Sequence, residues 1–325
     1  SEITYASAED DSTSQERFMA QVAATPAGGT LVLTENVAIT KDISIDKNIT
    51  IDGQGKYGFV AGMSNTPNDY TIYYPRIELT GVTFKDCNVR YETVVPAGTQ
   101  LGDGTVLQQD TTFIYEQGFF EIEYAAGVHI KRCTFLDSMG LYIGIAKSPV
   151  IIENCTFQNN KAIRQGYDYD VLAAYGFIHR ATWTEDITQL TNMANAITSD
   201  ESLNFYNNTP ITISGCSFTG GIARYDGSAI DINGAGNTTI TECTFTNNKC
   251  EATYSSGSVI NISYDATGTT TITNNTFSNN SGQSVICYGP ESGTLNWGGN
   301  TSDTSVQDSD TIMHPDTVTV NGTFN

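Results

Sequence analysis

The sequence predicts an all-β fold, a right-handed parallel β-helix that occupies residues 1–325 as a single domain. Three observations carry this prediction. A short pattern returns six times, apolar and polar residues alternate within each copy, and copies follow one another at spacings that include 22, 27 and 32 residues. A single such strand cannot bury its apolar face, whereas copies stacked at about 4.8 Å bury it against one another.

Each copy consists of an alternating strand, a turn and a Phe. The isoleucines at the centre of the strands, such as Ile130 and Ile213, share one position that we expect to face inward, while their neighbours face outward. The six copies occupy residues 77–84, 128–135, 150–157, 211–218, 238–245 and 270–277.

Stacked copies place like residues on like residues, so we expect ladders along the helix axis. The aromatic ladder contains Phe84, Phe135, Phe157, Phe218, Phe245 and Phe277. The thiol ladder contains Cys133, Cys155, Cys216 and Cys243, with Val82 and Asn275 at the same position in other copies. We expect a third set, Asn160, Asn248 and Asn280, to lie at a corner, bridge successive coils and adopt left-handed backbone conformations.

A second repeated phrase, Gly-Ser-X-Ile or a close variant, follows three copies at residues 227–232, 257–262 and 282–287 and predicts the next face of the coil. Residues 12–25 predict a helix that caps the N-terminal end, with Ser12 or Ser14 as N-cap and with Phe18 and Val22 on one face. Residues 31–33, 43–45 and 49–51 alternate as strands of the first coil. No second cap is recognisable after Val320, so we expect the chain to be part of a longer protein.

Two gaps between copies predict insertions, at residues 86–126 and 161–208. The second contains a helical pattern near residues 185–198. One interpretation makes this helix a lid packed on the flank of the β-helix, with its aromatic residues as local core. The other makes the insertion a glycan or protein site, in which aromatic rings stack on sugars and carboxylates accept hydroxyl hydrogen bonds. The candidate binding residues are Tyr167, Asp168, Tyr169, Asp170, His179 and Trp183.

The charge of the chain restricts its partners. Its 36 acidic and 15 basic residues give a net charge of −21, which repels phosphate backbones and anionic membranes. No apolar run approaches the roughly 20 residues of a membrane helix, and no signal peptide begins at Ser1, so we expect a mature segment that neither inserts into a membrane nor binds nucleic acid. A composition rich in Thr, Asn, Ser and Gly suits an extracellular or cell-surface protein.

The seven cysteines predict free thiols more than disulfides, because adjacent parallel strands offer poor disulfide geometry. A bond between Cys243 and Cys250 remains an alternative. We expect no cofactor and no metal site. Ca²⁺ held by scattered acids such as Asp303, Asp308 and Asp310 is an alternative that no motif supports.

The paired phrases Phe-X-X-Asn and Gly-Ser-Ala-Ile or Gly-Ser-Val-Ile resemble the repeats of chlamydial polymorphic outer-membrane proteins. They are also similar to adhesin-like β-helix proteins of gut bacteria and methanogenic archaea. The resemblance covers roughly residues 20–290 as a repeat pattern. It implies a non-catalytic, surface-exposed or secreted module that contacts a glycan or a protein of a host or partner cell, and we expect this module to be monomeric.

The same fold also carries polysaccharide lyases and glycoside hydrolases, so an enzyme is the alternative function. The nearest approach to a catalytic set is His129, Lys131 and Arg132 on one coil, beside Glu78 and Glu153 on its neighbours. Ion pairs between stacked strands explain this set more simply. Stacked Thr-X-Thr triplets at residues 212–214 (Thr-X-Ser here), 239–241 and 271–273 resemble ice-binding arrays, but other coils break the array, and β-propensity explains the threonines.

Overall fold

A computed structural model provides the architecture. It describes residues 12–39, 45, 47–61, 71–73, 76–87, 90–101, 104–116, 120–123, 127–137, 143–146, 149–159, 178–181, 210–223, 226–232, 236–251, 253, 257–264, 266–303 and 312–321.

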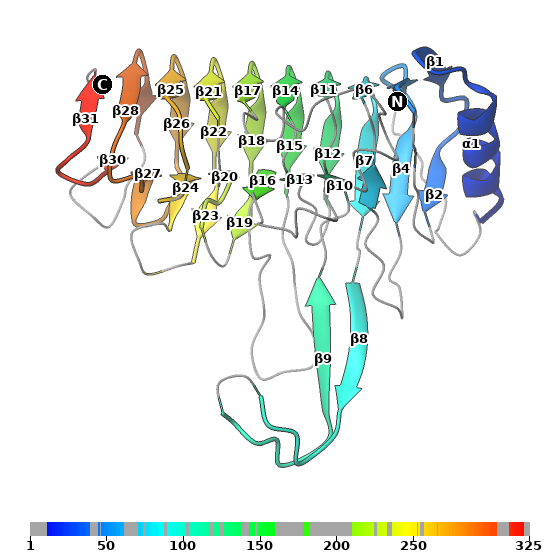
Figure 1. The fold of residues 1–325 in the computed structure, drawn as a ribbon, viewed down its shortest axis with the longest axis horizontal. Helices are drawn as coiled ribbons and strands as arrows, with labels where there is room; N and C mark the ends of the chain where they lie inside the picture. The colour runs from blue at the N-terminus through cyan, green and yellow to red at the C-terminus, as the bar shows by residue number, and fades with distance from the viewer. Residues whose placement is uncertain are drawn as a thin grey trace.

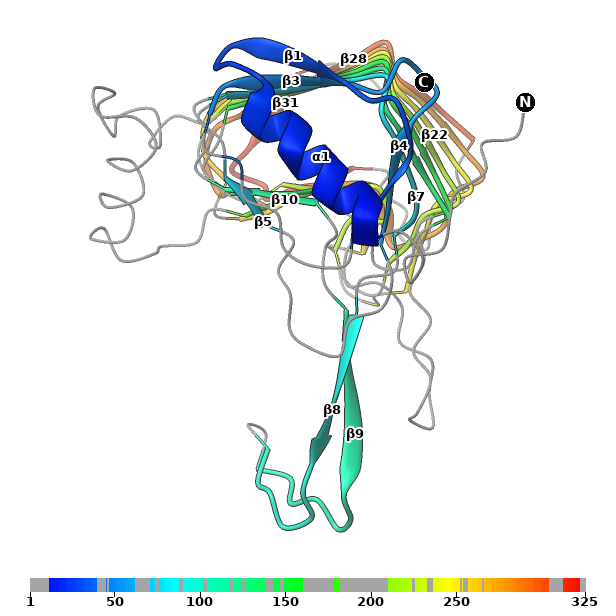
Figure 2. The ribbon, with the colours of Figure 1, turned by 90° about the vertical axis from the view of Figure 1, so that its right-hand side faces the viewer.

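Three parallel sheets wrap around one hydrophobic interior, and successive coils contribute strands in the order A, B, C, except that the described part of the first coil has no sheet C strand and the last has only β31 in sheet A. The coils follow one another along the long axis of the molecule, from α1 at one end to β31 at the other (Figure 1). Viewed down this axis, the strands of successive coils lie on one another and helix α1 crosses the end of the stack (Figure 2). The predicted parallel β-helix is therefore confirmed.

Along the axis, the strands of each sheet follow one another in the order of the chain. Sheet A contains β1 (Gly29–Val32), β3 (Ile49–Asp52), β6 (Arg76–Thr80), β11 (Gly127–Lys131), β14 (Val150–Glu153), β17 (Ile211–Ser214), β21 (Thr238–Thr241), β25 (Thr270–Thr273), β28 (Thr294–Gly298) and β31 (Thr319–Asn321). Sheet B contains β2 (Val37–Ile39), β4 (Gly58–Ala61), β7 (Thr83–Cys87), β12 (Thr134–Leu136), β15 (Thr156–Gln158), β18 (Ser217–Thr219), β22 (Thr244–Thr246), β26 (Thr276–Ser278) and β29 (Thr301–Ser302). Sheet C contains β5 (Thr71–Tyr73), β10 (Phe120–Glu123), β13 (Ile143–Ala146), β16 (Ile178–Ala181), β20 (Ile230–Ile232), β24 (Ser258–Ile262), β27 (Ser284–Tyr288) and β30 (Ile312–Met313).

The register between coils aligns like residues, as the repeat requires. Ile130, Ile152 and Ile213 are direct partners on neighbouring strands of sheet A, and each is completely buried. In sheet B the ring centroids of successive phenylalanines lie 4.7–4.9 Å apart with nearly parallel planes, from Phe84 to Phe277. Offset or parallel stacking at this separation adds to the free energy gained from apolar burial.

The position before the sheet B strand holds the row of cysteines, with Val82 ahead of them in the stack and Asn275 after them. Each thiol donates back to a neighbouring carbonyl, as Cys155 Sγ does to the Ile130 oxygen at 3.6 Å. A thiol also accepts a hydrogen bond from the preceding coil. For example, Cys216 Sγ accepts from the Cys155 backbone N–H at 3.5 Å. The four ladder cysteines are free thiols, so the structure contains no Cys243–Cys250 disulfide.

The corner between sheets B and C corrects one detail of the asparagine prediction. Asn248 and Asn280 bridge coils as expected, because Asn248 Nδ2 donates to the Phe218 carbonyl and Asn280 Nδ2 donates to the Phe245 carbonyl, both at 3.0 Å. The left-handed residue, however, is the preceding asparagine, with φ of 57° at Asn247 and 52° at Asn279. The first Asn tolerates the turn and the second supplies the bridge. Asn160 lies outside the described residues.

Helix α1 (Ser12–Ala24) closes the N-terminal end of the stack. Its Phe18 and Val22 side chains are buried, and the Phe18 ring meets Phe59 edge-on at 5.2 Å, so the helix caps the aromatic ladder. Ser14 lies inside the helix, and its Oγ accepts the Ala38 backbone N–H of β2 at 3.0 Å. The Ser14 side chain therefore ties the cap to the first coil.

The two predicted insertions overlap the coils. Residues 86–87 belong to β7, and β10 and β16 are coil strands of sheet C. Sequence reasoning missed β10 and β16 because neither carries the Gly-Ser phrase that marks sheet C in later coils.

Between β7 and β10 an antiparallel hairpin of β8 (Arg90–Val95) and β9 (Thr111–Glu116) projects away from the stack (Figures 1 and 2). A short parallel pair, β19 (Ile222–Ala223) and β23 (Lys249–Cys250), lies between sheets B and C. The helix predicted near residues 185–198 lies outside the described residues.

Candidate functional site

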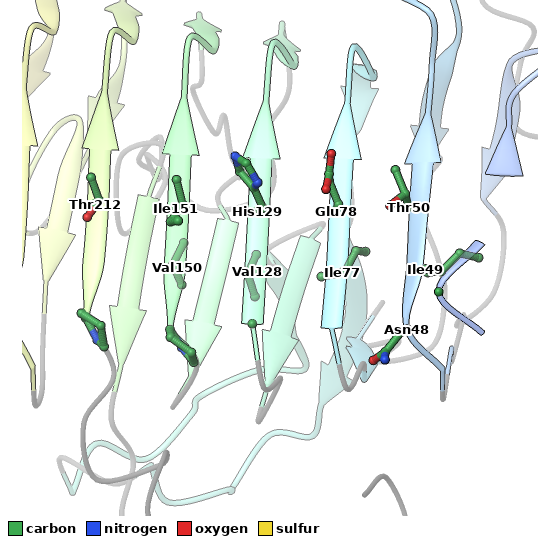
Figure 3. A pocket seen from close by; sticks show the side chains of 14 residues that line it. Asn48, Ile49, Thr50, Ile77, Glu78, Val128, His129, Val150, Ile151 and Thr212 are labelled. Carbon is green, nitrogen blue, oxygen red and sulfur yellow. The ribbon is translucent and has the colours of Figure 1, made fainter. Parts of the chain in front are cut away.

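A shallow groove of about 520 Å³ runs across the outer face of sheet A, over β3, β6, β11, β14 and β17. The pleat alternates inward and outward side chains, so one outward residue from each of these strands reaches the groove. Figure 3 shows Thr50, Glu78, His129, Ile151 and Thr212 side by side on successive coils. Ile151 is 44% exposed and presents apolar surface to the groove. The groove therefore offers an apolar surface with a few polar groups.

The edge of this groove is formed where sheet C turns into sheet A. Asn48, Gly127, Pro149 and Pro210 lie at the starts of the sheet A strands and line the groove. The proline carbonyls continue the ladder, because Val128 N–H donates to the Pro149 oxygen and Val150 N–H to the Pro210 oxygen, both at 2.9 Å. This edge is held by backbone hydrogen bonds.

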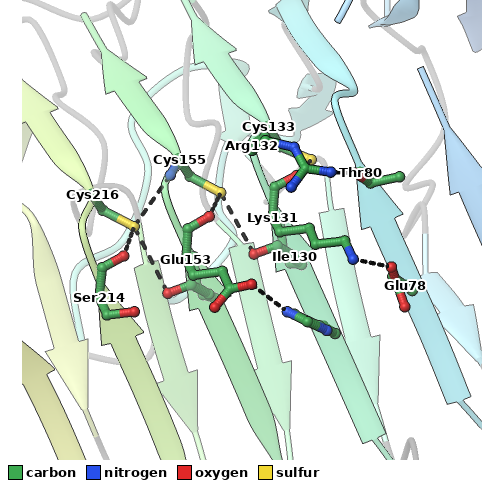
Figure 4. A network of polar contacts seen from close by, with 12 residues as sticks. Glu78, Thr80, Ile130, Lys131, Arg132, Cys133, Glu153, Cys155, Ser214 and Cys216 are labelled. Carbon is green, nitrogen blue, oxygen red and sulfur yellow. Dashed lines mark hydrogen bonds and ion pairs between the residues drawn. The ribbon is translucent and has the colours of Figure 1, made fainter. Parts of the chain in front are cut away.

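The acidic and basic residues singled out in the sequence pair diagonally across neighbouring strands (Figure 4). Lys131 Nζ lies 2.7 Å from Glu78 Oε1, and His129 Nε2 lies 3.0 Å from Glu153 Oε1. In the register, Glu78 lies directly opposite His129, and Glu153 lies directly opposite Lys131. Each acid therefore pairs with the basic residue that lies diagonally across from it, two positions along the strand from the directly opposite one. All four side chains are about one-quarter to one-third exposed, so the pairs lie at the solvent boundary.

Arg132 occupies the corner between sheets A and B, where every neighbouring coil needs a left-handed residue. Its φ is 52°, and the equivalent corner positions of other coils hold Gly81, Asn154, Gly215, Glu242, Asn274 and Gly299, all with positive φ. Arg132 Nη2 donates to Thr80 Oγ1 at 2.9 Å. A second hollow, of about 360 Å³, lies beside this corner and is lined by Asp52, Gln54, Gly55, Thr80, Gly81, Lys131 and Arg132. Because Gln54 and Glu242 adopt the same conformation at this corner in other coils, the left-handed backbone of Arg132 follows from the coil geometry.

Five of the six binding residues predicted from the sequence, Tyr167, Asp168, Tyr169, Asp170 and Trp183, lie outside the described residues. The backbone of His179 lies in β16, where its register partners are Gly144 and Asp231. Sequence reasoning missed Thr50, Ile151 and Thr212 as groove residues. The aligned outward positions of the repeat were the signal that could have identified them.

Sheet C contains a buried polar pair that was also missed. Asn261 Nδ2 donates to Asp231 Oδ1 at 2.7 Å, and Asp231 is only 1% exposed. These two residues are register partners on β20 and β24, between isoleucines that face the core. The phrases Ile-Asp-Ile and Ile-Asn-Ile in the repeat are the sequence signal for this pair. A buried carboxylate requires such a donor to offset its desolvation.

The thiol ladder lacks the properties of a catalytic cysteine. Hydrogen bonding to Cys155, together with burial, raises the pKa of the Cys216 thiol to about 12. Hydrogen bonds from neighbouring thiols and burial also raise the pKa values of Cys155 and Cys243. Because the thiolate is the reactive form, these side chains act as packing and hydrogen-bonding groups.

The described part of the chain offers neither a metal cluster nor a membrane-spanning helix. There, no three His, Cys, Asp or Glu side chains come close enough to share a metal ion. Asp303 instead accepts the Asn279 backbone N–H at 3.0 Å, while Asp308 and Asp310 lie outside the described residues. The described helix is too short and too polar to cross a membrane.

Comparison with known families agrees with this geometry. The family described as right handed beta helix region matches residues 47–301, which is most of the chain. The chain belongs to the right-handed β-helix family. No curated protein and no solved structure is similar enough to this right-handed β-helix protein to count as a match. The family accounts for the coil architecture, and its fold supports both binding proteins and enzymes that act on polysaccharides.

Proposed function

We propose that this β-helix is a non-catalytic binding module of a secreted or cell-surface protein, and that its ligand is a glycan or a protein on a partner cell. The resemblance to chlamydial polymorphic outer-membrane protein repeats and to adhesin-like proteins supports the proposal. The chain acts as a monomer in this proposal, without a cofactor.

The observation that carries the proposal is the pairing of the acidic and basic residues beside the groove. Lys131 with Glu78 and His129 with Glu153 satisfy one another on an open strand face. A general acid or base needs its proton directed at a bound substrate, in a site from which water is largely excluded. An open face on which an ion pair and a His–Glu hydrogen bond satisfy these groups suits recognition better than proton transfer.

A carbohydrate-active enzyme is the second candidate, and the groove itself favours it. Glu78 and His129 line the groove, and Arg132 lies at the next corner of the same coil. A polysaccharide lyase needs a base for the proton next to a uronate and cations for its carboxylate. His129 and Arg132 are the residues to which this candidate assigns those roles.

Binding and turnover are separated by running two assays on the same purified chain. A glycan array, together with binding to intact partner cells, measures recognition. Absorbance of unsaturated uronate products on pectin, alginate and glycosaminoglycans, with and without Ca²⁺, measures lyase turnover, and reducing-end release measures hydrolysis. We expect saturable binding and no product.

Variants decide between the two candidates. Product formation that disappears in His129→Ala, Lys131→Ala or Arg132→Ala would show an enzyme and contradict the proposal. Thr239→Ala is the matched control, because Thr239 is an outward residue of sheet A on β21, beyond the groove. Absence of both binding and turnover in the intact chain would also contradict the proposal.

A further inference from the structure

A third hollow, of about 920 Å³, lies near the C-terminal end of the stack. Its walls are the loops that lead from sheet C to sheet A in three successive coils, between β24 and β25, β27 and β28, and β30 and β31. These loops belong to the same edge of the coils that borders the sheet A groove. The lining residues are Tyr264, Ala266, Thr267, Gly268, Thr269, Gly289, Pro290, Glu291, Ser292, Gly293, Thr294 and Pro315.

Tyr264 is the most conspicuous residue of this hollow. Its side chain is 79% exposed, while the other described large hydrophobic residues that are exposed reach at most 62%. An aromatic ring has a flat apolar face and, in Tyr, a polar edge, so exposing it in water has a free-energy cost that a stacked partner removes. An exposed ring inside a hollow is suited to a ligand with one flat apolar face.

Close backbone packing makes the hollow a preformed surface. Gly289 N–H donates to the Ile262 carbonyl at 2.8 Å, and a Cβ at Gly289 would come within 2.7 Å of the Tyr264 backbone nitrogen. Asn237 Oδ1 accepts the Thr269 backbone N–H at 2.9 Å, which fixes the end of the loop that holds Tyr264. Thr317 Oγ1 also donates to the Glu291 carbonyl. A preformed site loses less conformational entropy when it binds.

The charge of the hollow selects against anionic ligands. Glu291 is the one charged side chain among the described lining residues, and no Lys or Arg contributes. The chain as a whole carries a net charge of −21, so an anionic sugar is repelled at long range as well. Hydroxyl groups of Thr267, Thr269, Ser292 and Thr294 supply neutral hydrogen-bonding partners.

We propose that this hollow binds an uncharged glycan, with a pyranose ring stacked on Tyr264 and its hydroxyls bonded to Glu291 and the loop hydroxyls. The inference rests on the proposed binding function and deepens it by naming a site and a sugar class. It places recognition away from the sheet A groove and excludes polyuronates as ligands of this hollow.

The test measures binding of soluble tetrasaccharides to the full chain by titration calorimetry and saturation-transfer NMR. The uncharged probes are mannotetraose, cellotetraose, xylotetraose and galactotetraose, and the acidic comparators are tetragalacturonate and tetraguluronate. Tyr264→Ala removes the stacking ring, and Tyr264→Phe keeps it. Val32→Ala is the control, because Val32 is an exposed hydrophobic residue of β1 that lines neither the hollow nor the sheet A groove, and Ile151→Ala reports on binding in the groove, which Ile151 lines. Far-UV circular dichroism verifies that each variant is folded.

We expect at least one uncharged tetrasaccharide to bind, with about tenfold or greater loss of affinity in Tyr264→Ala. Tyr264→Phe and Val32→Ala are expected to stay within about threefold of the wild type, and the acidic probes to bind at least about tenfold more weakly. Equal binding by Tyr264→Ala, or equal binding of tetragalacturonate, overturns this site. Loss in Ile151→Ala alone moves the ligand to the sheet A groove, which overturns this site but keeps the proposed binding function. Binding of a partner-cell protein with no binding of any sugar does the same.

Discussion

At the corner between sheets A and B, a buried Cys or Asn side chain bonds the backbone of neighbouring coils, whereas Val82 fills the same position in an earlier coil. In the middle coils a cysteine does this with its thiol, and in later coils Asn275 and Asn300 do it with an amide. Asn275 Nδ2 donates to the Ile240 carbonyl at 3.0 Å, and its Oδ1 accepts the Cys243 N–H at 2.9 Å. Cys243 Sγ makes the equivalent longer contacts, to the Ile213 carbonyl at 3.8 Å and from the Cys216 N–H at 3.5 Å. Cys and Asn are therefore interchangeable in role at this position.

Replacing Asn275 tests this role. Asn275→Ala leaves the Cys243 N–H and the Ile240 carbonyl without these partners in a buried corner, so we expect a loss of about 2 to 4 kcal/mol in the free energy of unfolding. Asn275→Cys is expected to lose less, because a thiol supplies weaker versions of both contacts. Urea unfolding measures both variants, with Thr271→Ala on the outer face of β25 as control. A loss in Asn275→Ala no greater than in the control would contradict the role.

The raised thiol pKa values predict a dependence of stability on pH. The Cys216 thiol has an ordinary pKa of 9.0. In the folded chain, hydrogen bonding to Cys155 and burial raise this pKa to about 12. Below pH 9 both states keep the proton, so the full contribution to stability is present. Between about pH 9 and 12 the unfolded chain releases the proton first, so stability falls as the pH rises.

The comparison for this pH dependence is Cys216→Asn, because an amide does not titrate and Asn275 already occupies the equivalent position. Urea midpoints measured from pH 7 to 11 should fall more steeply in the wild type than in Cys216→Asn. Tyr and Lys titrate in both proteins, so their effects cancel. Parallel pH profiles would show that the thiol pKa is unchanged by folding.

At the scale of elements, helix α1 protects the first coil. Without it, the ladder that runs from Phe59 through Phe84 would end at solvent. At the opposite end of the ladder Trp297 lies against Phe277, with ring centroids 6.3 Å apart. Ser14 adds a hydrogen bond to β2, and Arg17 pairs with Glu35, where the guanidinium lowers the pKa of the carboxyl. The buried Phe18 contributes more than the exposed ion pair.

Phe18→Ala therefore measures the value of the cap. We expect a loss of about 3 to 5 kcal/mol in the free energy of unfolding, because a buried aromatic ring is removed and a cavity remains against Phe59. Glu16→Ala, on the exposed side of α1, should stay within about 0.5 kcal/mol of the wild type. Thermal and urea unfolding give both values. Equal effects of the two changes would show that the helix packs too loosely to act as a cap.

At the scale of the whole molecule, stability comes from repetition and is opposed by charge. Each coil buries its apolar side chains against the next, so the core is one continuous cluster from Phe18 to Val318. The chain has a net charge of −21, so its acidic side chains repel one another on balance, and this repulsion opposes folding. Contacts between an acid and a basic residue, such as Glu78 with Lys131 and Glu153 with His129, relieve this repulsion only locally.

Salt should therefore stabilise the protein. Raising NaCl from about 0.01 M to 1 M shortens the screening length from roughly 30 Å to 3 Å, which weakens repulsion between distant acids more than it weakens the short ion pairs. We expect the thermal midpoint to rise with NaCl. A midpoint that falls with salt would mean that the ion pairs outweigh the net repulsion. KCl in place of NaCl checks that the effect does not depend on the cation.

The sequence alone determined the coil, because its information is local and repeated. Alternating strands, a fixed Phe and a fixed Cys or Asn leave one arrangement that buries all of them, and the register follows from aligning the copies. The N-terminal cap followed for the same reason, since Phe18 and Val22 share a helix face. Even the ion pairs beside His129 were predictable, because stacked coils bring known positions together.

Only the tertiary structure decided the features that depend on surfaces built by several coils. The strands β10 and β16 lack the repeated phrase, and their neighbours in sheet C define them. The hollow around Tyr264 arises from loops of three coils that lead from sheet C to sheet A, and the shape of the sheet A groove depends on side chains that five strands bring together. The exposure of Tyr264 in particular is a property of the loops around it. Local sequence fixes which face a side chain takes, whereas the shape of the surface it faces is set by residues far away in the chain.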